Sequence, residues 1–388
     1  RYRHACAAVT ARLYVFGGRS NSGRLAKGVL QFDLLSGVWS ELEASAARPP
    51  AQSCPPTFAP SIPLSPRRSL PGPQVGSKQL DDVGVNEYTP ELRWGHTMNA
   101  AGEWVVVFGG HRRRGSLNDI ALLDTRAVEW VRPHVTGTPP PPRGNHAAVV
   151  VASRLWVFGG DAPATGLLPQ QVYSATLPHD GLLTGTTVAW ECPQVSGEPP
   201  PPCCDHAAVG CGSRVLVLGG SSGGGYLPLD RIAVFDTGAL AWAWIAAGAG
   251  GAPSARAGHV AAALPAAGGG ARFRVLVFGG GNSETGFNDV AELAFDGKAS
   301  WRKCAPARGA DPPPLATEGA AVALSGGVLV VCGGYTSAGA TSQTYAWACE
   351  APEAEGVDAK LKLLQAAKDG GALSQALYEQ ARRELYDV

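Results

Sequence analysis

Short apolar runs separated by polar breaks recur along most of the chain. The clearest copy spans residues 143–160, where His146 precedes a run of small and β-branched residues. Ser153 and Arg154 interrupt that run, and a second apolar run then ends in two glycines. Strands favour β-branched and aromatic residues bounded by polar or glycine breaks, so the segment predicts two neighbouring strands. Related copies begin at Arg3, Arg93, Cys203, Arg256 and Thr317.

Every copy ends in a glycine pair. The pairs are Gly17 and Gly18, Gly109 and Gly110, Gly159 and Gly160, Gly219 and Gly220, Gly279 and Gly280, and Gly333 and Gly334. Successive first glycines are 92, 50, 60, 60 and 54 residues apart. A period of about fifty residues, with insertions, is typical of folds that repeat one supersecondary unit. Paired glycines after a strand indicate positive φ or a close approach of neighbouring backbone.

Each repeat predicts four strands, which we name a to d. In the third copy they are 146–151, 155–158, 171–177 and 188–192. In the first copy they are 5–10, 13–16, 29–33 and 38–41. The last copy predicts 320–324, 328–332 and 342–348, with no clear fourth strand. Strand d carries a tryptophan in five copies, namely Trp39, Trp130, Trp190, Trp242 and Trp301.

The glycine pair, the tryptophan of strand d and the R-x-G-H or R-x-x-H start of the repeat resemble the kelch-repeat family. That resemblance implies a β-propeller in which each repeat forms one four-stranded blade. The expected fold is therefore an all-β, six-bladed kelch-type propeller over residues 1–350. Because the last repeat lacks strand d, we expect residues upstream of Arg1, or a partner, to supply it.

Two segments depart from the strand pattern. Residues 43–90 are rich in Pro, Ser and Ala, and this composition predicts a disordered or extended insertion between the first two blades. Residues 356–387 change to helical spacing, with a break at Gly370 and Gly371, which predicts a short C-terminal α-helical hairpin. Its second half resembles the small SHOCT-type C-terminal domain. Helices this short are marginal alone, so we expect the hairpin to dock on the propeller or on another chain.

Composition narrows the classes of partner. The 32 basic and 32 acidic residues cancel, so bulk charge gives no reason to expect nucleic acid or a membrane surface. No apolar run reaches the roughly eighteen residues of a membrane helix. The nine cysteines are odd in number and lack the spacing of zinc ligands or a disulfide framework, which indicates reduced thiols in the cytoplasm. A cytoskeletal or ciliary setting is a narrower expectation.

One set of residues raises the question of metal chemistry. Five of the eight histidines occupy the same repeat position, namely His4, His96, His146, His206 and His259. A ring of histidines fits a metal site, but a residue that nearly every blade repeats is better explained by the needs of the blade. The propeller fold also occurs in copper radical oxidases and iron-dependent specifier proteins. This chain lacks the E-x-x-x-D-x-x-x-H motif of the latter and any assignable copper set. We therefore predict no catalytic residue, cofactor or metal.

Loop placement points to one face of the propeller. In an antiparallel blade the b–c loops and the d–a connections share a face, and here those loops are the longer and more varied ones, as expected of a functional face. We predict that this face binds a protein with an acidic surface. The expected contacts are His111, Arg112, Arg113, Arg114 and Tyr335. For the arginine run alone, an ordinary solvated loop is an equal alternative.

The resulting hypothesis is a non-catalytic interaction module, a scaffold subunit of a multi-protein complex. Two alternatives stay open. One is a substrate-recognition adaptor of a ubiquitin ligase, whose BTB or F-box domain would lie before residue 1. The other is a metal- or ligand-dependent propeller enzyme, whose site would assemble from distant loops.

Overall fold

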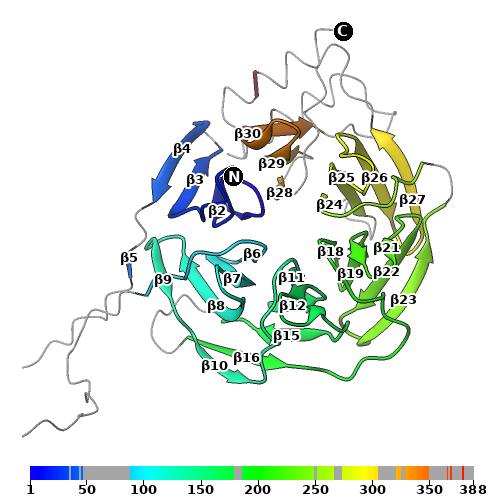
Figure 1. Cartoon of the computed structure of the whole chain (residues 1–388), viewed down its shortest axis with the longest axis horizontal. Coiled ribbons are helices and arrows are strands. Elements are labelled where there is room, and N and C mark those ends of the chain that lie inside the picture. Colours follow the sequence, from blue (N-terminus) through cyan, green and yellow to red (C-terminus); the bar gives the residue numbers. More distant parts are fainter. Residues whose placement is uncertain are drawn as a thin grey trace, which may run out of the picture.

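The computed structural model describes residues 1–34, 36–42, 45–46, 88–178, 186–248, 251–265, 273–304, 320–324 and 328–348, with Gln365, Lys368, Tyr378 and Glu379. Apart from these last four residues, this part of the chain consists of strands and loops, so the all-β prediction is confirmed. Figure 1 shows the sheets arranged as a ring around a common centre. No helix in the described ranges is long and apolar enough to cross a bilayer.

Six of the sheets each follow one sequence repeat, and we number them blade 1 to blade 6. Blade 1 holds β1 (Ala5–Val9), β2 (Arg12–Phe16), β3 (Val29–Asp33) and β4 (Val38–Leu42). Blade 2 holds β6 (Thr97–Ala101), β7 (Trp104–His111), β8 (Ser116–Asp124) and β9 (Glu129–Val131). Blade 3 holds β11 (Ala147–Val151), β12 (Arg154–Phe158), β15 (Tyr173–Thr176) and β16 (Thr187–Glu191).

The second half of the ring continues the pattern. Blade 4 holds β18 (Ala207–Cys211), β19 (Arg214–Leu218), β22 (Arg231–Asp236) and β23 (Ala241–Ala246). Blade 5 holds β24 (Val260–Pro265), β25 (Phe273–Phe278), β26 (Val290–Phe295) and β27 (Ala299–Cys304). The described part of blade 6 holds β28 (Ala320–Leu324), β29 (Val328–Thr336) and β30 (Gly339–Ala348). Since that sheet shows three strands, the number of complete blades stays a prediction.

The first strand of every blade is innermost, and these strands touch one another around the ring. Strands β1, β6, β11, β18, β24 and β28 contact in that order, and β28 contacts β1 again. Within each blade, strands a to d pair antiparallel with their sequence neighbours. This topology places the b–c loops and the d–a connections at the same end of every blade, as predicted.

The connections between blades also form strands along the outer edge. β10 (His134–Gly137) follows blade 2 but pairs parallel with β16 of blade 3. Likewise β5 (Ser45–Ala46) pairs parallel with β9. The insertion predicted at residues 43–90 therefore begins with a short strand, because the edge of the next blade extends the sheet into it. Residues 43–44 and 47–87 of the insertion lie outside the described residues.

Aromatic side chains pack across the seams between blades. The Phe108 ring of blade 2 lies 4.9 Å from Trp190 of blade 3, and Phe16 of blade 1 lies 5.3 Å from Trp130 of blade 2. Burying such rings contributes about 1.5–3 kcal/mol each. Trp39 differs from the other strand-d tryptophans, because 37% of its side chain is exposed. Cys332 stands before the glycine pair of blade 6, where blades 1 and 2 have Phe16 and Phe108.

The glycine pair and the repeated histidine interlock neighbouring blades. Gly109 has φ +61°, and a Cβ there would lie 3.0 Å from Cε1 of His146 in the next blade. Gly110 has φ +100°, and a Cβ there would lie 2.8 Å from Cβ of His96 in its own blade. Glycine is required at both positions because positive φ and the missing Cβ are needed together.

Blades 1, 3, 4 and 6 repeat this arrangement of first glycine and next histidine. The pairs are Gly17 with His96, Gly159 with His206, Gly219 with His259 and Gly333 with His4. At the closing seam, Nε2 of His4 lies 3.0 Å from the carbonyl oxygen of Cys332. These histidines thus hold the seams between blades.

A buried arginine starts most repeats. Arg93, Arg143 and Arg256 each donate from Nη1 to the carbonyl oxygen of the first glycine of their own blade. In blade 1, Arg1 makes the equivalent bond to Gly17 at 3.2 Å. The prediction that the first repeat begins at Arg3 is therefore wrong by two residues. Both Arg1 and Arg3 fit the start of the repeat in the sequence, and the structure shows that Arg1 makes this bond.

The predicted C-terminal hairpin falls almost wholly outside the described residues. Gln365, Lys368, Tyr378 and Glu379 have helical backbone. The Lys368 ammonium lies 4.7 Å from the centre of the Tyr378 ring. The hairpin, and its SHOCT-like character, stay predictions.

Candidate partner-binding face

A belt of backbone hydrogen bonds joins blades 1 to 5 at the inner end of the b–c face. The amide of Gly95 donates to Arg3, that of Asn145 to Gly95, that of Asp205 to Asn145 and that of Gly258 to Asp205, at 2.7–2.9 Å. All five residues have φ between +51° and +64°. This left-handed backbone is uncommon for side chains other than Gly, Asn and Asp, and it turns each amide toward the preceding blade.

The side chains of this belt surround a central cavity of about 120 Å³. The Arg3 guanidinium lies 3.7 Å from the Asp205 carboxylate and 3.5 Å from Oδ1 of Asn145. Three blades thus meet in one polar cluster, formed at a repeat position that is glycine in blades 2 and 5. Variation at this position distinguishes it from the repeated histidine, which is the same residue in blades 1 to 5.

The five repeated histidines line the same cavity and are buried. Burial lowers the pKa of His4 and His259 to about 3 and that of His206 to about 4. Burial also holds the pKa of His96 and His146 well below the usual range. Neutral rings packed on glycines fit the structural role of this repeat position. Within the described ranges, no group of three or more His, Cys, Asp or Glu side chains is arranged to hold a metal ion.

His111, predicted to contact a partner from a loop, ends strand β7 instead, and its side chain is 4% exposed. Its Nδ1 lies 2.9 Å from Oγ of Ser116. Its Nε2 lies 3.2 Å from Nδ2 of Asn145 and 3.4 Å from Oδ1 of Asp161, both in blade 3. His111 therefore supports the face between two blades, and a direct partner contact stays a prediction.

Arg112, Arg113 and Arg114 form the exposed tip of the hairpin between β7 and β8. Nη1 of Arg112 donates to both carboxylate oxygens of Glu91 at 3.1 Å, and its Nε donates to the carbonyl oxygen of Arg114. Among the residues that the structure describes, no ion pair forms to Arg113 or Arg114. These two charges are therefore the ones available to another molecule.

The set of basic side chains on this face extends from blade 2 into blade 1. Arg24 and Lys27 are exposed in the b–c loop of blade 1. The Arg19 guanidinium in that loop lies 4.7 Å from the centre of the Trp94 ring, across the seam. Cations stacked on an aromatic ring are held in place at low entropic cost. Blades 1 and 2 thus form a basic sector, which comprises Arg19, Arg24, Lys27, Arg113 and Arg114.

Tyr335 is a second exposed element of this face. It lies near the end of β29, and 44% of its side chain is exposed. The ring packs edge-to-face on Tyr2, with centroids 5.0 Å apart, and so bridges blades 6 and 1. A rigid, partly exposed tyrosine is typical of the residues that anchor protein interfaces.

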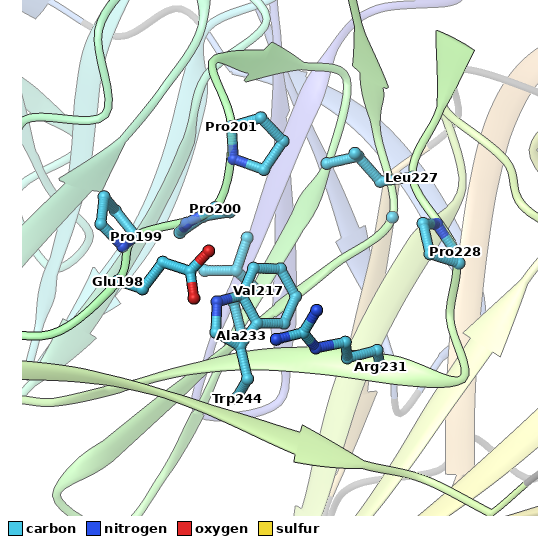
Figure 2. Close-up of a pocket in the computed structure, with 11 residues that line it drawn as sticks. Glu198, Pro199, Pro200, Pro201, Val217, Leu227, Pro228, Arg231, Ala233 and Trp244 are labelled. Atoms are coloured by element: carbon cyan, nitrogen blue, oxygen red, sulfur yellow. The ribbon is translucent and has the colours of Figure 1, made fainter. Parts of the chain in front are cut away.

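The sequence prediction missed a pocket in blade 4, with a volume of about 400 Å³. Figure 2 shows Pro199, Pro200 and Pro201 along one wall, with Glu198 and Arg231 on either side of Trp244. The guanidinium of Arg231 lies 4.6 Å from the centre of the Trp244 ring. The available signal in the sequence was Cys203, which stands where blades 1, 2, 3 and 5 have an arginine, buried in blades 2, 3 and 5.

Comparison with known proteins agrees with this architecture. The model of the KLHDC2/KLHL20/DRC7 Kelch-repeats domain matches residues 95–334, and the model of the Kelch motif matches residues 1–44. The solved structure of YjhT superposes with a TM-score of 0.57 and 13% identity, covering 89% of this chain and 94% of that one. At this identity the likeness concerns the fold alone.

Curated relatives are longer proteins. "Acyl-CoA-binding domain-containing protein 4" of Arabidopsis thaliana is 28% identical over 280 residues, which are 66% of this chain and 40% of that protein. "Rab9 effector protein with kelch motifs" of Rattus norvegicus is 33% identical over 120 residues, 31% of this chain and 30% of that protein. The chain therefore spans well under half the length of these relatives.

Proposed function

Because the chain belongs to the kelch-repeat family, we propose that it is a non-catalytic interaction module whose b–c face binds an acidic surface of a protein partner. Kelch repeats generally mediate protein interactions, and this is the established part of the assignment. The proposal adds the face, the chemistry of the partner and the role of a scaffold subunit in a larger assembly. It also includes a closed ring of six complete blades.

The single observation that carries the proposal is the basic sector of blades 1 and 2. Arg113 and Arg114 project from a hairpin whose two strands are anchored in the blade, so their backbone is held in place before binding. Their charges are not neutralised by the Glu91 pair, which engages Arg112. Basic residues presented this way steer an acidic partner into contact and favour it over neutral surfaces.

The belt gives the face its rigidity. Neighbouring blades are joined there by backbone hydrogen bonds and by the His111, Asn145 and Asp161 cluster. A surface that is already ordered loses little entropy on binding, so its contacts translate more fully into affinity. The exposed Tyr335 would supply an aromatic anchor beside the basic sector.

The test is affinity purification from the native source with two charge-reversal variants. Arg113→Glu with Arg114→Glu reverses the proposed surface. Arg126→Glu, an exposed arginine in the c–d turn of the same blade, changes the opposite face and is the matched control. The proposal predicts that a stoichiometric partner is lost with the double variant and kept with the control, while circular dichroism stays unchanged. Retention of every partner by the double variant would contradict it.

A further inference from the structure

The pocket of blade 4 lies where other blades bury an arginine side chain. Arg143 in blade 3 shows the arrangement. Its Nε donates to the carbonyl oxygen of Pro141 and its Nη1 to that of Gly159, while Cζ lies 5.2 Å from the centre of the Tyr173 ring. The guanidinium is thus enclosed by a proline carbonyl, the first glycine of the blade and a strand-c side chain.

The corresponding residues in blade 4 all line the pocket. Repeat spacing places Pro201 at the position of Pro141 and Gly219 at that of Gly159. The pairing of strands b and c places Ala233 opposite Val217, as Tyr173 lies opposite Val157. The carbonyl that accepts from arginine in blades 1, 2, 3 and 5 therefore belongs, in blade 4, to a residue of the pocket wall.

Two substitutions open this space, and a third changes its charge. Cys203 stands at the arginine position, and the register of strands b and c places Arg231 where Asp119 and Asp289 pair with Arg93 and Arg256. Ala233 replaces the tyrosine ring of blade 3. Burial raises the pKa of the Cys203 thiol to about 12, so this side chain is neutral and carries none of the missing charge.

The walls that remain suit a guanidinium on an aliphatic stem. Leu227 occupies the position of Phe287, whose ring lies 4.0 Å from Cζ of Arg256 in blade 5. Pro200 and Pro201 offer apolar surface, and the exposed Glu198 supplies a negative charge at the mouth. The Pro201 carbonyl already accepts from Nε2 of Gln170 at 3.1 Å, so the acceptor offered to a ligand is the carbonyl of Gly219. Arginine binds well where a carbonyl acceptor, flat apolar surface and a carboxylate meet.

We propose that the blade 4 pocket binds the guanidinium of an arginine side chain presented by the protein partner, in the space that the chain's own arginine fills in the other blades. This inference rests on the proposed function, because the pocket lies at the b–c and d–a end of blade 4. It adds a site for one side chain of the partner, apart from the basic sector of blades 1 and 2.

The arginine of the partner enters between opposite charges. Glu198 attracts it, whereas Arg231, held on the Trp244 ring, repels it. Replacing each by glutamine should therefore change affinity for a guanidinium in opposite directions. A carboxylate ligand would show the reverse pattern, and an apolar ligand would show neither effect.

The experiment uses the full chain and N-acetyl-arginine amide, titrated by saturation-transfer NMR, with N-acetyl-citrulline amide as the neutral isostere. The arginine probe should bind at least about tenfold more tightly than citrulline, which corresponds to the loss of one charge-assisted interaction. Glu198→Gln should weaken it by about two- to fivefold, the range for an exposed ion pair, and Arg231→Gln should strengthen it.

Variants that place a side chain inside the pocket test whether the probe binds there. Cys203→Arg, combined with Arg231→Asp, restores the pair found in blades 2 and 5 and should abolish binding of the probe, while Cys203→Ser should leave it unchanged. Equal binding of citrulline, binding to the filled variant, or no binding to the wild-type chain would each overturn the proposal. If the filled variant does not fold, the Glu198 and Arg231 variants still decide the question.

These outcomes are separable from failure of the proposed function. If Arg113→Glu with Arg114→Glu abolishes binding of a partner but the arginine probe does not bind, the proposed interaction face is supported and only the pocket proposal is refuted. If the probe binds in the pocket but no such partner is found, the pocket proposal is supported and the proposed interaction face is refuted.

Discussion

The buried histidines predict a specific response to mild acid. Their folded-state pKa lies below the ordinary value of 6.5, because burial disfavours the charged ring. In the unfolded chain the same rings accept a proton near pH 6.5. The stability that the neutral, buried histidines contribute is therefore fully present above about pH 6.5. It is lost as the pH falls toward the folded-state pKa.

The magnitude follows from proton linkage. Between pH 7.5 and 5.5, a histidine with unfolded pKa 6.5 and folded pKa of about 4 or below loses about 1.3 kcal/mol of unfolding free energy. The three rings with values of about 3 or 4, His4, His206 and His259, together lose about 4 kcal/mol. Burial also lowers the pKa of His96 and His146, so these two rings add to the loss in the same direction. The loss from His4, His206 and His259 alone approaches the roughly 5–15 kcal/mol by which domains are stable.

The assay is urea unfolding followed by tryptophan fluorescence at steps between pH 7.5 and 5.5. Carboxylates contribute little in this window, because their ordinary pKa values lie near 4. His259→Gln should reduce the change in unfolding free energy between pH 7.5 and 5.5 by about 1.3 kcal/mol, an average of about half a proton over the window. His134→Gln, which changes an exposed histidine of β10, is the control. A stability that stays constant over this range would refute the assignment of neutral, buried rings.

Three further substitutions test the seams and the buried arginines. Arg93→Met should cost about 3–5 kcal/mol in urea unfolding, because it leaves the carboxylate of Asp119 without its bidentate partner. Arg143→Met should cost less, about 1–3 kcal/mol, because no carboxylate pairs with that guanidinium in the described part of the chain. Gly109→Ala should destabilise the fold by at least about 2 kcal/mol more than Gly102→Ala, a difference within the range for core overpacking. Both glycines have φ near +60°, but only Gly109 has neighbours within reach of a Cβ, so equal costs would contradict the interlock.

Much of the blade could be predicted from sequence because its signals are local. Short apolar runs bounded by polar residues or glycine placed strand β3 at its observed bounds and β2 to within one residue. Glycine pairs marked the ends of strand b in blades 1, 3, 4 and 5, because these glycines need positive φ, whereas β7 and β29 continue through their pairs to His111 and Thr336. The tryptophans marked strand d, although Trp39 stays partly exposed.

What could not be predicted depends on contacts between blades. His111 ends up buried because Asn145 and Asp161, from the next repeat, close over it. The parallel strands β5 and β10 form only because an outer edge of the next blade is available to pair with them.

The blade 4 pocket could not be predicted from the sequence, for a related reason. It results from the absence of an arginine, and its meaning appears only when the surroundings of Arg143 are compared with those of Cys203. A single repeat read alone shows a cysteine in a proline-rich connection and gives no sign of a cavity.

The central claim is that a protein partner sits on the b–c face, and site-specific photo-crosslinking tests it most directly. A benzophenone amino acid would replace Arg113 on that face or Arg126 on the opposite face of the same blade, in the full chain within its native extract. The account predicts a crosslinked partner of defined mass from position 113 and none from position 126. Crosslinks from position 126 alone would place the partner on the other face and contradict the account.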